Sequence, residues 1–378
     1  MSVRNALARK GITAGRVWAG CAAVVVVVFL WRGVSASLLD LRVYLTGGRV
    51  WLDGGELYGA AFPGPHGLPF TYPPFAAALF APLVLPPWPV VVGLWTAAGV
   101  ALLGWVCVLA AGERERGLWL ASACLLLEPV RGTLELGQVN LLLLALVAAD
   151  CLLPRPPWPR GLLLGIAASV KLTPAIFVLF LLSRKDFRAA LTAAATFAGC
   201  AVLGWSLAPR DSVVFWTSAV VDPDRVGGLP YAGNQSAKGV LVRLGLDGPL
   251  WFAACAVVLA LLVVVLRGVR DDLTAVVATA AAGVLVSPVS WSHHWVWAAP
   301  ALLLLHGRAR LVVGAVLLVG PHWLLPRTGD VELAWAWWQH LVGDAYALLG
   351  LGFLVALARR ELRRAAHPPV GAAVPTGG

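Results

Sequence analysis

Residues 90–111 read VVVGLWTAAGVALLGWVCVLAA, and this stretch decides the class of fold. It contains no charged side chain, and a run of about 20 apolar residues can cross a lipid bilayer as a helix. Comparable runs occupy Ala22–Leu30, Leu250–Leu266 and Leu348–Ala358. Such repeated runs predict an all-α integral membrane protein, because in lipid a helix satisfies its own backbone hydrogen bonds.

The composition of the whole chain supports this prediction. Of the 378 residues, 60% are hydrophobic and only 13% are charged, and the mean hydropathy is +0.82. A soluble domain carries roughly 25% charged residues. A soluble α/β enzyme with buried parallel strands is therefore excluded, since too few charged side chains remain to solvate its surface.

Neither the cysteines nor the known short motifs indicate a metal or a cofactor. The six cysteines lie inside apolar runs, form no Cys-x-x-Cys pair and behave as small hydrophobic residues. No P-loop, Gly-x-Gly-x-x-Gly, His-Glu-x-x-His or Gly-x-Ser-x-Gly motif occurs in a usable context. We therefore expect no disulfide, no metal and no cofactor.

The net charge of +10 could indicate binding to nucleic acid, but the distribution of the basic residues argues against it. They lie in short segments between apolar runs, which is the positive-inside pattern of cytoplasmic segments. These segments are the N-terminus up to Arg16, then 111–117, 154–160, 184–188, 267–272, 306–310 and 359–367. We expect no nucleic-acid partner.

Placing the basic segments in the cytoplasm predicts where the chain crosses the plasma membrane. Pro174 offers a break at which the stretch 161–183 goes out and returns, because proline interrupts a helix. A signal peptide is the competing interpretation of residues 17–36, but that run is long enough to span and no clear cleavage site follows it. The result is a polytopic bundle of about twelve membrane segments with both termini cytoplasmic. The other predicted crossings are 88–110, 118–130, 139–153, 188–207, 250–266, 273–287, 293–305, 309–325 and 341–358.

The polar clusters gather on the opposite, outer side of this predicted topology. Since chance would scatter reactive groups over both sides, we expect a site at the outer boundary. Residues 1–358 form a single transmembrane domain in this prediction, and 359–378 form a basic, then Pro/Gly-rich cytoplasmic tail that we expect to be disordered. The outer segments are the first loop 37–87, then 131–138, the long loop 208–249, 288–292 and 326–340.

Asp40 directly follows the first apolar run. A carboxylate near the hydrocarbon boundary is costly, so it usually serves a function or pairs with a base. The competing interpretation is an N-cap, since Asp-Leu-Arg-Val-Tyr-Leu is typical of a helix start. Both interpretations stay open on the local sequence alone.

His293 and His294 lie at the mouth of an apolar segment, beside serines and tryptophans. Interfacial tryptophans are ordinary belt residues. Adjacent side chains point about 100° apart on a helix, so we expect only one histidine to face a given site. A lone histidine here would be structural more often than catalytic, but two histidines beside two serines favour a functional interpretation.

Amide side chains are candidates for binding sugar hydroxyls. Gln138 and Asn140 stand at the start of a predicted helix, where they either cap the helix or bind substrate. Asn234 and Gln235 repeat the same chemistry in the long outer loop.

Cationic side chains are candidates for binding phosphate. Lys171 is placed within the membrane, just before the proline break, and a cation there suits a lipid phosphate group. Arg131, Lys238 and Arg243 are further phosphate candidates in outer segments.

These residues fall in a series of short motifs that resembles glycosyltransferase family 87. The family comprises actinobacterial GT-C membrane enzymes and includes the polyprenyl-phosphomannose-dependent α-1,2-mannosyltransferases of phosphatidylinositol mannoside and lipomannan synthesis. The resemblance runs from residue 16 to residue 358. The motifs are Asp40-Leu-Arg-Val-Tyr44, Gly55-Glu-Leu-Tyr58, Phe70-Thr-Tyr-Pro-Pro-Phe75, Gly137-Gln-Val-Asn140, Lys171-Leu-Thr-Pro174, Gly233-Asn-Gln-Ser236 and the stretch Ser287 to Trp297.

The resemblance implies an inverting transfer of mannose at the outer face of the plasma membrane. Asp40 holds the place of the family's catalytic carboxylate, and either His293 or His294 would orient the acceptor or relay its proton. The implied partners are a polyprenyl-phosphate-mannose donor, a glycolipid acceptor of the phosphatidylinositol mannoside or lipomannan type, and membrane lipids. The remaining substrate-binding candidates, in or beside these motifs, are Arg42, Tyr44, Tyr72, Glu135 and Trp291.

Two alternatives remain. The same fold could transfer arabinofuranose or glucose from a polyprenyl phosphate, because the choice of sugar depends on the shape of the pocket. A transporter or lipid flippase would have polar residues along a path through the membrane, often with repeated halves. The sequence instead gathers its polar groups on one side and has no evident repeat.

Overall fold

A computed structural model describes residues 13–33, 38–246 and 248–367. Every regular element within these ranges is a helix. An isolated antiparallel bridge joins Asn234 to Trp291. The predicted all-α class is therefore confirmed for the described residues.

Four described helices are long and apolar enough to cross a membrane: α2 (Ala14–Gly33), α5 (Trp88–Ala111), α11 (Phe187–Leu207) and α14 (Pro249–Gly268). Two bent pairs bring the number to six if each pair counts as one span. The pairs are α7 (Glu128–Leu136) with α8 (Asn140–Leu152), bent by 118°, and α18 (Trp337–Gly343) with α19 (Ala345–Ala366), bent by 77°. Among the described residues, four helices, or six if each bent pair counts once, are long and apolar enough to cross a membrane, which does not confirm the predicted number of about twelve.

Several predicted crossings form helices that are too short to span. The predicted crossing 273–287 is α15 (Asp272–Val286), which is buried over nearly its whole length. Its apolar sequence therefore reflects packing against other helices, a case that hydropathy alone cannot separate from contact with lipid. The other short helices at predicted crossings are α6 (Arg114–Cys124), η6 (Ser292–Trp297), α16 (Ala298–Ala301) and α17 (Gly307–Val319).

The chain breaks before Pro174, as predicted. Helix α9 (Leu162–Val170) ends at Lys171, whose backbone is extended with φ −150° and ψ 131°. The 3₁₀ helix η3 (Thr173–Phe177) follows with Pro174 in its first turn, and α10 (Val178–Ser183) continues from it. Lys171 thus sits on extended backbone between two helical segments.

The remaining elements form the connections and the outer segments. They are α3 (Leu39–Leu52), η1 (Pro65–Gly67), α4 (Pro74–Phe80), η2 (Ala81–Val84), α12 (Pro209–Thr217), η4 (Ala219–Val221), η5 (Pro223–Val226), α13 (Ala237–Arg243), η7 (Pro321–Leu324) and η8 (Val331–Ala334).

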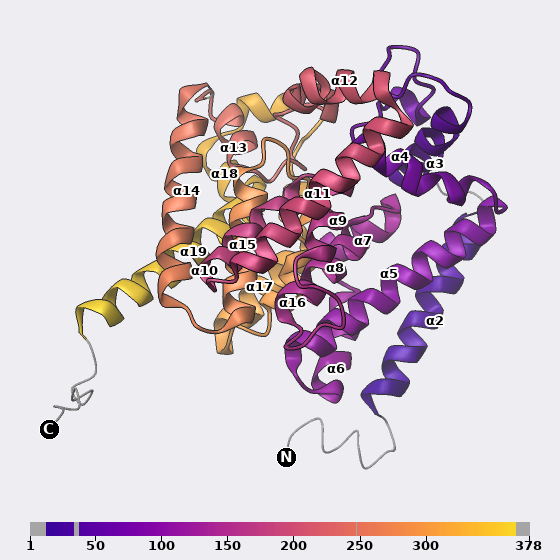
Figure 1. Cartoon of the computed structure of the whole chain (residues 1–378). Coiled ribbons are helices and arrows are strands. Elements are labelled where there is room, and N and C mark those ends of the chain that lie inside the picture. The colour runs from indigo at the N-terminus through magenta and orange to yellow at the C-terminus, as the bar shows by residue number, and fades with distance from the viewer. Residues whose placement is uncertain (1–12, 34–37, 247, 368–378) are drawn as a thin grey trace, which may run out of the picture.

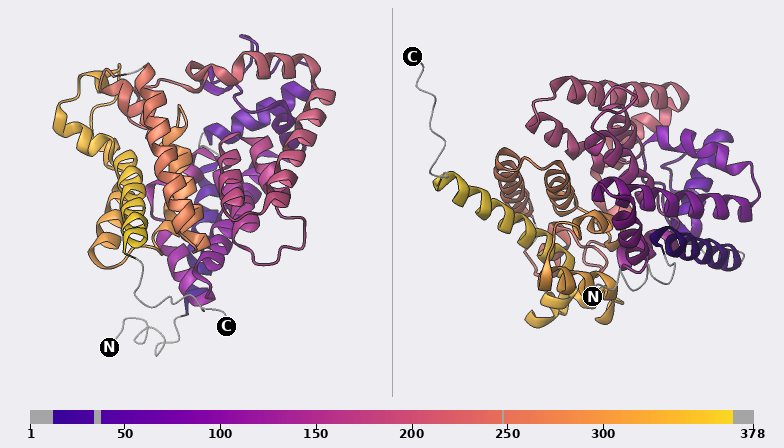
Figure 2. Two further views of the ribbon diagram at one scale, coloured as in Figure 1. Left: turned by 60° about the vertical axis from the view of Figure 1, so that its left-hand side comes forward. Right: turned by 90° about the horizontal axis from the view of Figure 1, so that it is seen from below.

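The helices pack in two groups, and a central set made of η6 and the helices around it lies between these groups. Helix α5 packs against α2, α6 and α8, whereas α14, α15 and α19 pack against one another. Helix α2 lies at one margin of the molecule and α19 at the opposite margin (Figure 2). Between them, η6 packs against α7, α8 and α15. The central set therefore carries both histidines.

Elements from distant parts of the chain meet at one end of the molecule. Helices α3, α4 and α12 lie together at that end, and α6 lies at the other (Figure 1). Segments 37–87 and 208–249 thus both contribute helices to this end of the molecule (Figure 1). Helix α19 continues to Ala366, so all four arginines of the tail that we expected to be disordered are helical, while 368–378 lie outside the described residues.

Candidate active site

Asp40 lies in the first turn of α3, and Leu38 is the N-cap residue. The N-cap interpretation of Asp40 is therefore wrong. A carboxylate in the first turn is stabilised by the positive end of the helix dipole. The side chain is partly buried.

Lys171 and Gln138 are the groups that act on the Asp40 carboxylate. Burial raises the pKa of Asp40 from 3.8 to about 6, and the charge of Lys171 and a hydrogen bond from Gln138 limit that rise. A carboxylate with a pKa near the working pH is suited to act as a general base.

Two tyrosines fix the orientation of Gln138. The hydroxyl of Tyr44 donates to Gln138 Oε1, and the hydroxyl of Tyr72 lies 3.2 Å from the same oxygen. The two hydroxyl oxygens are 3.0 Å apart. Because Oε1 is occupied by these donors, the amide nitrogen of Gln138 is the atom left to donate to Asp40.

Lys171 connects the group around Asp40 with the segment that carries the histidines. Its Nζ atom lies 3.4 Å from Asn140 Oδ1 and 3.0 Å from His294 Nε2. A lysine ammonium group has donors and no acceptor, so Nε2 of His294 has to accept and the ring proton sits on Nδ1. His294 is therefore a neutral imidazole that orients the lysine.

His293 has its backbone fixed and its ring nitrogen unused. Its carbonyl oxygen accepts from Asn140 Nδ2 at 2.8 Å and from Thr133 Oγ1 at 2.9 Å. Its Nε2 atom is buried and has no hydrogen-bond partner within the described parts of the chain. A buried ring nitrogen without a partner is costly unless a ligand or water satisfies it.

A cavity of about 50 Å³ opens beside this cluster, between α8, η3, α15 and η6. Its polar lining comes from Asn140, Lys171, Thr173 and His294. The rest of the wall is largely apolar, including Leu143 and Phe177. No group of three or more His, Cys, Asp or Glu side chains among the described residues is placed to hold a metal ion.

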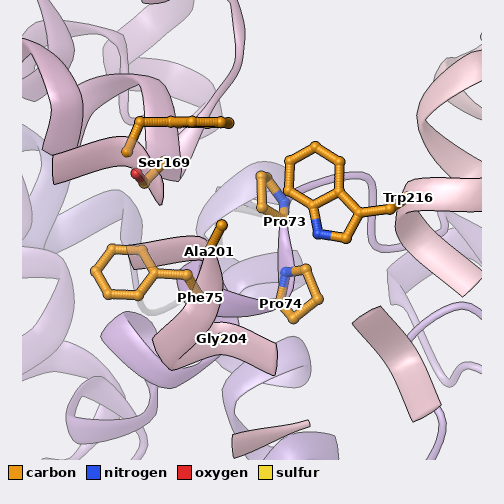
Figure 3. A pocket seen from close by; sticks show the side chains of 8 residues that line it. Pro73, Pro74, Phe75, Ser169, Ala201, Gly204 and Trp216 are labelled. Atoms are coloured by element: carbon orange, nitrogen blue, oxygen red, sulfur yellow. The ribbon is translucent and has the colours of Figure 1, made fainter. Parts of the chain in front are cut away.

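A second hollow lies where Trp216 faces Pro73 and Pro74 (Figure 3). It holds about 10 Å³ and is lined almost entirely by apolar side chains. That volume is close to the minimum for a single water molecule. The cavity at Lys171 is therefore the better candidate for a ligand site.

The sequence predictions missed Glu128, which is 7% exposed at the start of α7. Its Oε1 atom accepts from Ser292 Oγ at 2.7 Å and from Trp323 Nε1 at 2.8 Å. Its Oε2 atom accepts from the hydroxyl of Tyr346 at 2.8 Å. Glu128 thus ties the start of η6 to η7 and α19. A lone acid after the run Cys-Leu-Leu-Leu was the signal available in the sequence.

Asn234 and Gln235 use their polar groups within the protein. Asn234 Oδ1 accepts from the backbone nitrogen of Ser290 at 3.0 Å, and the backbone nitrogen of Gln235 donates to Ser290 O at 2.7 Å. The Gln235 amide donates to the carbonyl oxygen of Gly343 at 2.7 Å. Both side chains are fully buried, so they hold the segment before the histidines and do not line the cavity.

The other predicted residues lie outside this cluster of contacts. Arg42 is exposed, with its guanidinium 4.2 Å from the ring centre of Trp88. Arg131 is exposed and donates to Leu318 O, and Glu135 is exposed on the same helix. The Nζ atom of Lys238 lies 4.7 Å from the ring centre of Trp251. Trp291 is half-buried and packs against Tyr231.

Comparison with known proteins gives the context for this geometry. A relative from Mycobacterium tuberculosis is 40% identical across 86% of this chain and 86% of its own length. It is named polyprenol-phosphate-mannose-dependent alpha-(1-2)-phosphatidylinositol mannoside mannosyltransferase. A relative of the same name from Mycolicibacterium smegmatis is 40% identical across 91% of this chain and 87% of its own length.

A more distant relative from Mycobacterium tuberculosis is named polyprenol-phosphate-mannose-dependent alpha-(1-2)-phosphatidylinositol pentamannoside mannosyltransferase. It is 35% identical across 86% of this chain and 83% of its own length. No solved structure matches. The family model described as glycosyltransferase family 87 matches residues 70–288. With that match and relatives of this similarity over most of its length, the chain belongs to glycosyltransferase family 87.

Proposed function

We propose that this chain moves mannose from polyprenyl-phosphate mannose to a mannose 2-hydroxyl of a phosphatidylinositol mannoside-type glycolipid, at the outer face of the plasma membrane. The observation that carries this proposal is the placement of Asp40, Gln138, Lys171 and His294 in one partly buried cluster. The names of the similar mycobacterial proteins support the donor, the acceptor and the linkage.

The reaction is a single inverting displacement. Asp40 accepts the proton of the acceptor hydroxyl while that oxygen forms a bond to the anomeric carbon of β-mannosyl phosphate. The bond from the anomeric carbon to the phosphate oxygen breaks, and polyprenyl phosphate leaves with the electron pair. General-base assistance of this kind contributes about 10²–10⁴-fold to the rate. Because the phosphate leaves as a stable anion, the reaction needs no general acid.

Lys171 is the cation that faces the leaving phosphate in this scheme. His294 and Asn140 hold its ammonium group, with contacts of 3.0 and 3.4 Å. A cation held in advance at the point where negative charge develops stabilises the transition state. The apolar side chains that line the rest of the cavity, such as Leu144 and Val284, receive the first isoprene units of the donor.

His293 positions a sugar hydroxyl, and Gln138 positions the carboxylate that accepts the proton. The unpartnered Nε2 of His293 binds a sugar hydroxyl, and the amide of Gln138 holds the Asp40 carboxylate in position. Asn234, Gln235 and Glu128 contribute indirectly, because they fix the segment that carries His293.

The test uses purified full-length protein in lipid nanodiscs with polyprenyl-phosphate mannose and a panel of mannosylated lipids. We expect a product extended by one mannose, with an α-1,2 linkage established by linkage analysis. Product formation only from a polyprenyl arabinofuranose or glucose donor would contradict the choice of mannose. A product with another linkage would contradict the choice of the 2-hydroxyl.

A further inference from the structure

Three aromatic side chains from three separate segments of the chain meet next to the histidines. The ring centre of Tyr231 lies 6.0 Å from that of Trp291 and 5.9 Å from that of Trp323. Tyr231 is 37% exposed, and both tryptophans are half-buried. We call these three residues the aromatic wall.

Two glycines allow this close packing. A Cβ atom at Gly227 would lie 3.1 Å from the Trp291 ring, and one at Gly233 would lie 2.9 Å from the Trp323 ring. The backbone of Gly227 also has a φ of 121°, a conformation that side chains rarely permit. The rings therefore lie directly against the backbone of the long outer segment.

The aromatic wall is tied to the candidate active site by two connections. The backbone nitrogen of His294 donates to Trp291 O at 2.7 Å. Trp323 Nε1 and Ser292 Oγ both donate to the same oxygen of Glu128. Since Ser292 directly precedes His293, the aromatic wall has a fixed position relative to both histidines.

Ordinary interfacial tryptophans look different in this structure. Trp337 is 77% exposed and Trp31 is 79% exposed, as expected for belt residues in contact with lipid. The rings of the aromatic wall instead pack edge to face or at a tilt against one another and keep only part of their surface free. Arg327 extends the wall, with its guanidinium 5.2 Å from the Trp323 ring centre and one N–H donated to Trp323 O.

This combination fits a carbohydrate ring. A pyranose has an apolar face of C–H groups that packs on an aromatic ring, and a rim of hydroxyls that needs hydrogen-bond partners. Binding sites of this kind combine aromatic surface with a few placed polar groups. The cavity at Lys171 suits the phosphate and apolar chain of the donor. The mannose ring of the acceptor would therefore bind at a separate site, the aromatic wall.

We infer that Tyr231, Trp291 and Trp323 form the acceptor subsite, on which a mannose ring of the glycolipid packs while Arg327 donates to its hydroxyls. The inference rests on the proposed function, because that function supplies the mannosylated acceptor. It also assigns Tyr231, Trp323 and Arg327 a direct role in binding.

The test compares Tyr231→Leu with Tyr231→Phe in the full-length protein. Both changes preserve the backbone contacts of residue 231, and only the leucine removes the aromatic face. Loss of one stacking ring changes affinity about tenfold. We therefore expect Tyr231→Leu to raise the KM for phosphatidylinositol mannoside about tenfold, with the KM for polyprenyl-phosphate mannose unchanged. Tyr231→Phe should keep both constants within about twofold of wild type.

An unchanged acceptor KM in Tyr231→Leu would overturn the inference. So would an acceptor KM that rises equally in Tyr231→Leu and Tyr231→Phe, or a donor KM that rises as much as the acceptor KM in Tyr231→Leu. If Tyr231→Leu fails to fold, Trp291→Leu against Trp291→Phe provides the same comparison. Binding of phosphatidylinositol mannoside without donor, measured by native mass spectrometry, separates this inference from the proposed function. Weaker binding in the leucine variant supports the acceptor subsite even if wild type transfers no mannose, and equal binding overturns it.

Discussion

Lys171 Nζ lies 3.0 Å from His294 Nε2, although 123 positions separate the two residues in the chain. Each residue lies where a regular α-helix is interrupted. Lys171 is on extended backbone after α9, and His294 is in the 3₁₀ helix η6. These irregular segments place the ammonium group of Lys171 and the imidazole of His294 at the cavity wall. In a continuous α-helix, the direction of each side chain would be set by the regular helical repeat.

Replacing Asp40 by asparagine should reduce kcat about 10²–10⁴-fold, because the variant cannot accept the proton of the acceptor hydroxyl. Folding should be retained, since burial disfavours the charge that the substitution removes. The measurement is mannose transfer at saturating substrates. Asp53→Asn is the matched control, because that side chain is 66% exposed and pairs with Arg49 at the surface. A folded Asp40→Asn variant with near wild-type kcat would remove Asp40 from the role of base.

The rate should depend on pH through the pKa of Asp40, which is about 6. A general base has to be ionised, so kcat/KM should rise with pH, reach half its maximum near pH 6 and level off above it. The sign for stability is the opposite. Since the folded-state pKa is above 3.8, Asp40 favours the folded state at low pH, and this contribution is lost as pH rises through 6. A kcat/KM that stays constant between about pH 5 and pH 7 would contradict this prediction.

Replacing Lys171 by methionine should weaken donor binding and shift the pH profile. Loss of the partner of a buried phosphate costs about 2 kcal/mol or more, so the donor KM should rise about 30-fold. The midpoint of kcat/KM should move above pH 6, because the charge of Lys171 lowers the pKa of Asp40. Lys185→Met, at an exposed lysine, is the control. A raised donor KM without a shifted midpoint would separate Lys171 from Asp40.

Replacing Glu128 by glutamine should lower kcat and raise the acceptor KM, because Glu128 holds both Trp323 and the segment that carries His293. The donor KM should stay nearly unchanged. The glutamine cannot accept all the hydrogen bonds from Ser292, Trp323 and Tyr346, and one unsatisfied buried donor costs about 1–3 kcal/mol. The start of η6 then loses its fixed position, and His293 moves with it. Thermal unfolding and transfer kinetics should both be measured, with Glu56→Gln as an exposed control. Lower stability with unchanged kcat would limit Glu128 to a structural role.

Replacing Asp344 by alanine should destabilise the protein by about 3–5 kcal/mol, because it leaves Arg243 buried without its partner. Arg243 Nη2 lies 2.6 Å from Asp344 Oδ1, and both side chains are almost fully buried. Asp53→Ala breaks an exposed pair and should change stability by about 0–1 kcal/mol. The measurement is thermal unfolding in detergent, and equal shifts in the two variants would contradict the difference.

The local sequence was sufficient for features that depend on local physics. Long apolar runs identified α2, α5, α11 and α14, because hydropathy and length are properties of one segment. The break at Lys171 followed from Pro174, which limits its own backbone and that of the residue before it. The position of Asp40 after the first apolar run, together with the motif series, identified the family.

Only the tertiary structure decided which apolar segments are buried and which polar groups are free. Helix α15 resembles a span in sequence but is apolar because other helices surround it. Asn234 and Gln235 resembled sugar ligands, yet their amides bond to the protein. The contact of Lys171 with His294 and the bond from Tyr346 to Glu128 join positions 123 and 218 residues apart. Hydrogen bonds at such separations form only when the helices pack, so no pattern within one segment could specify them.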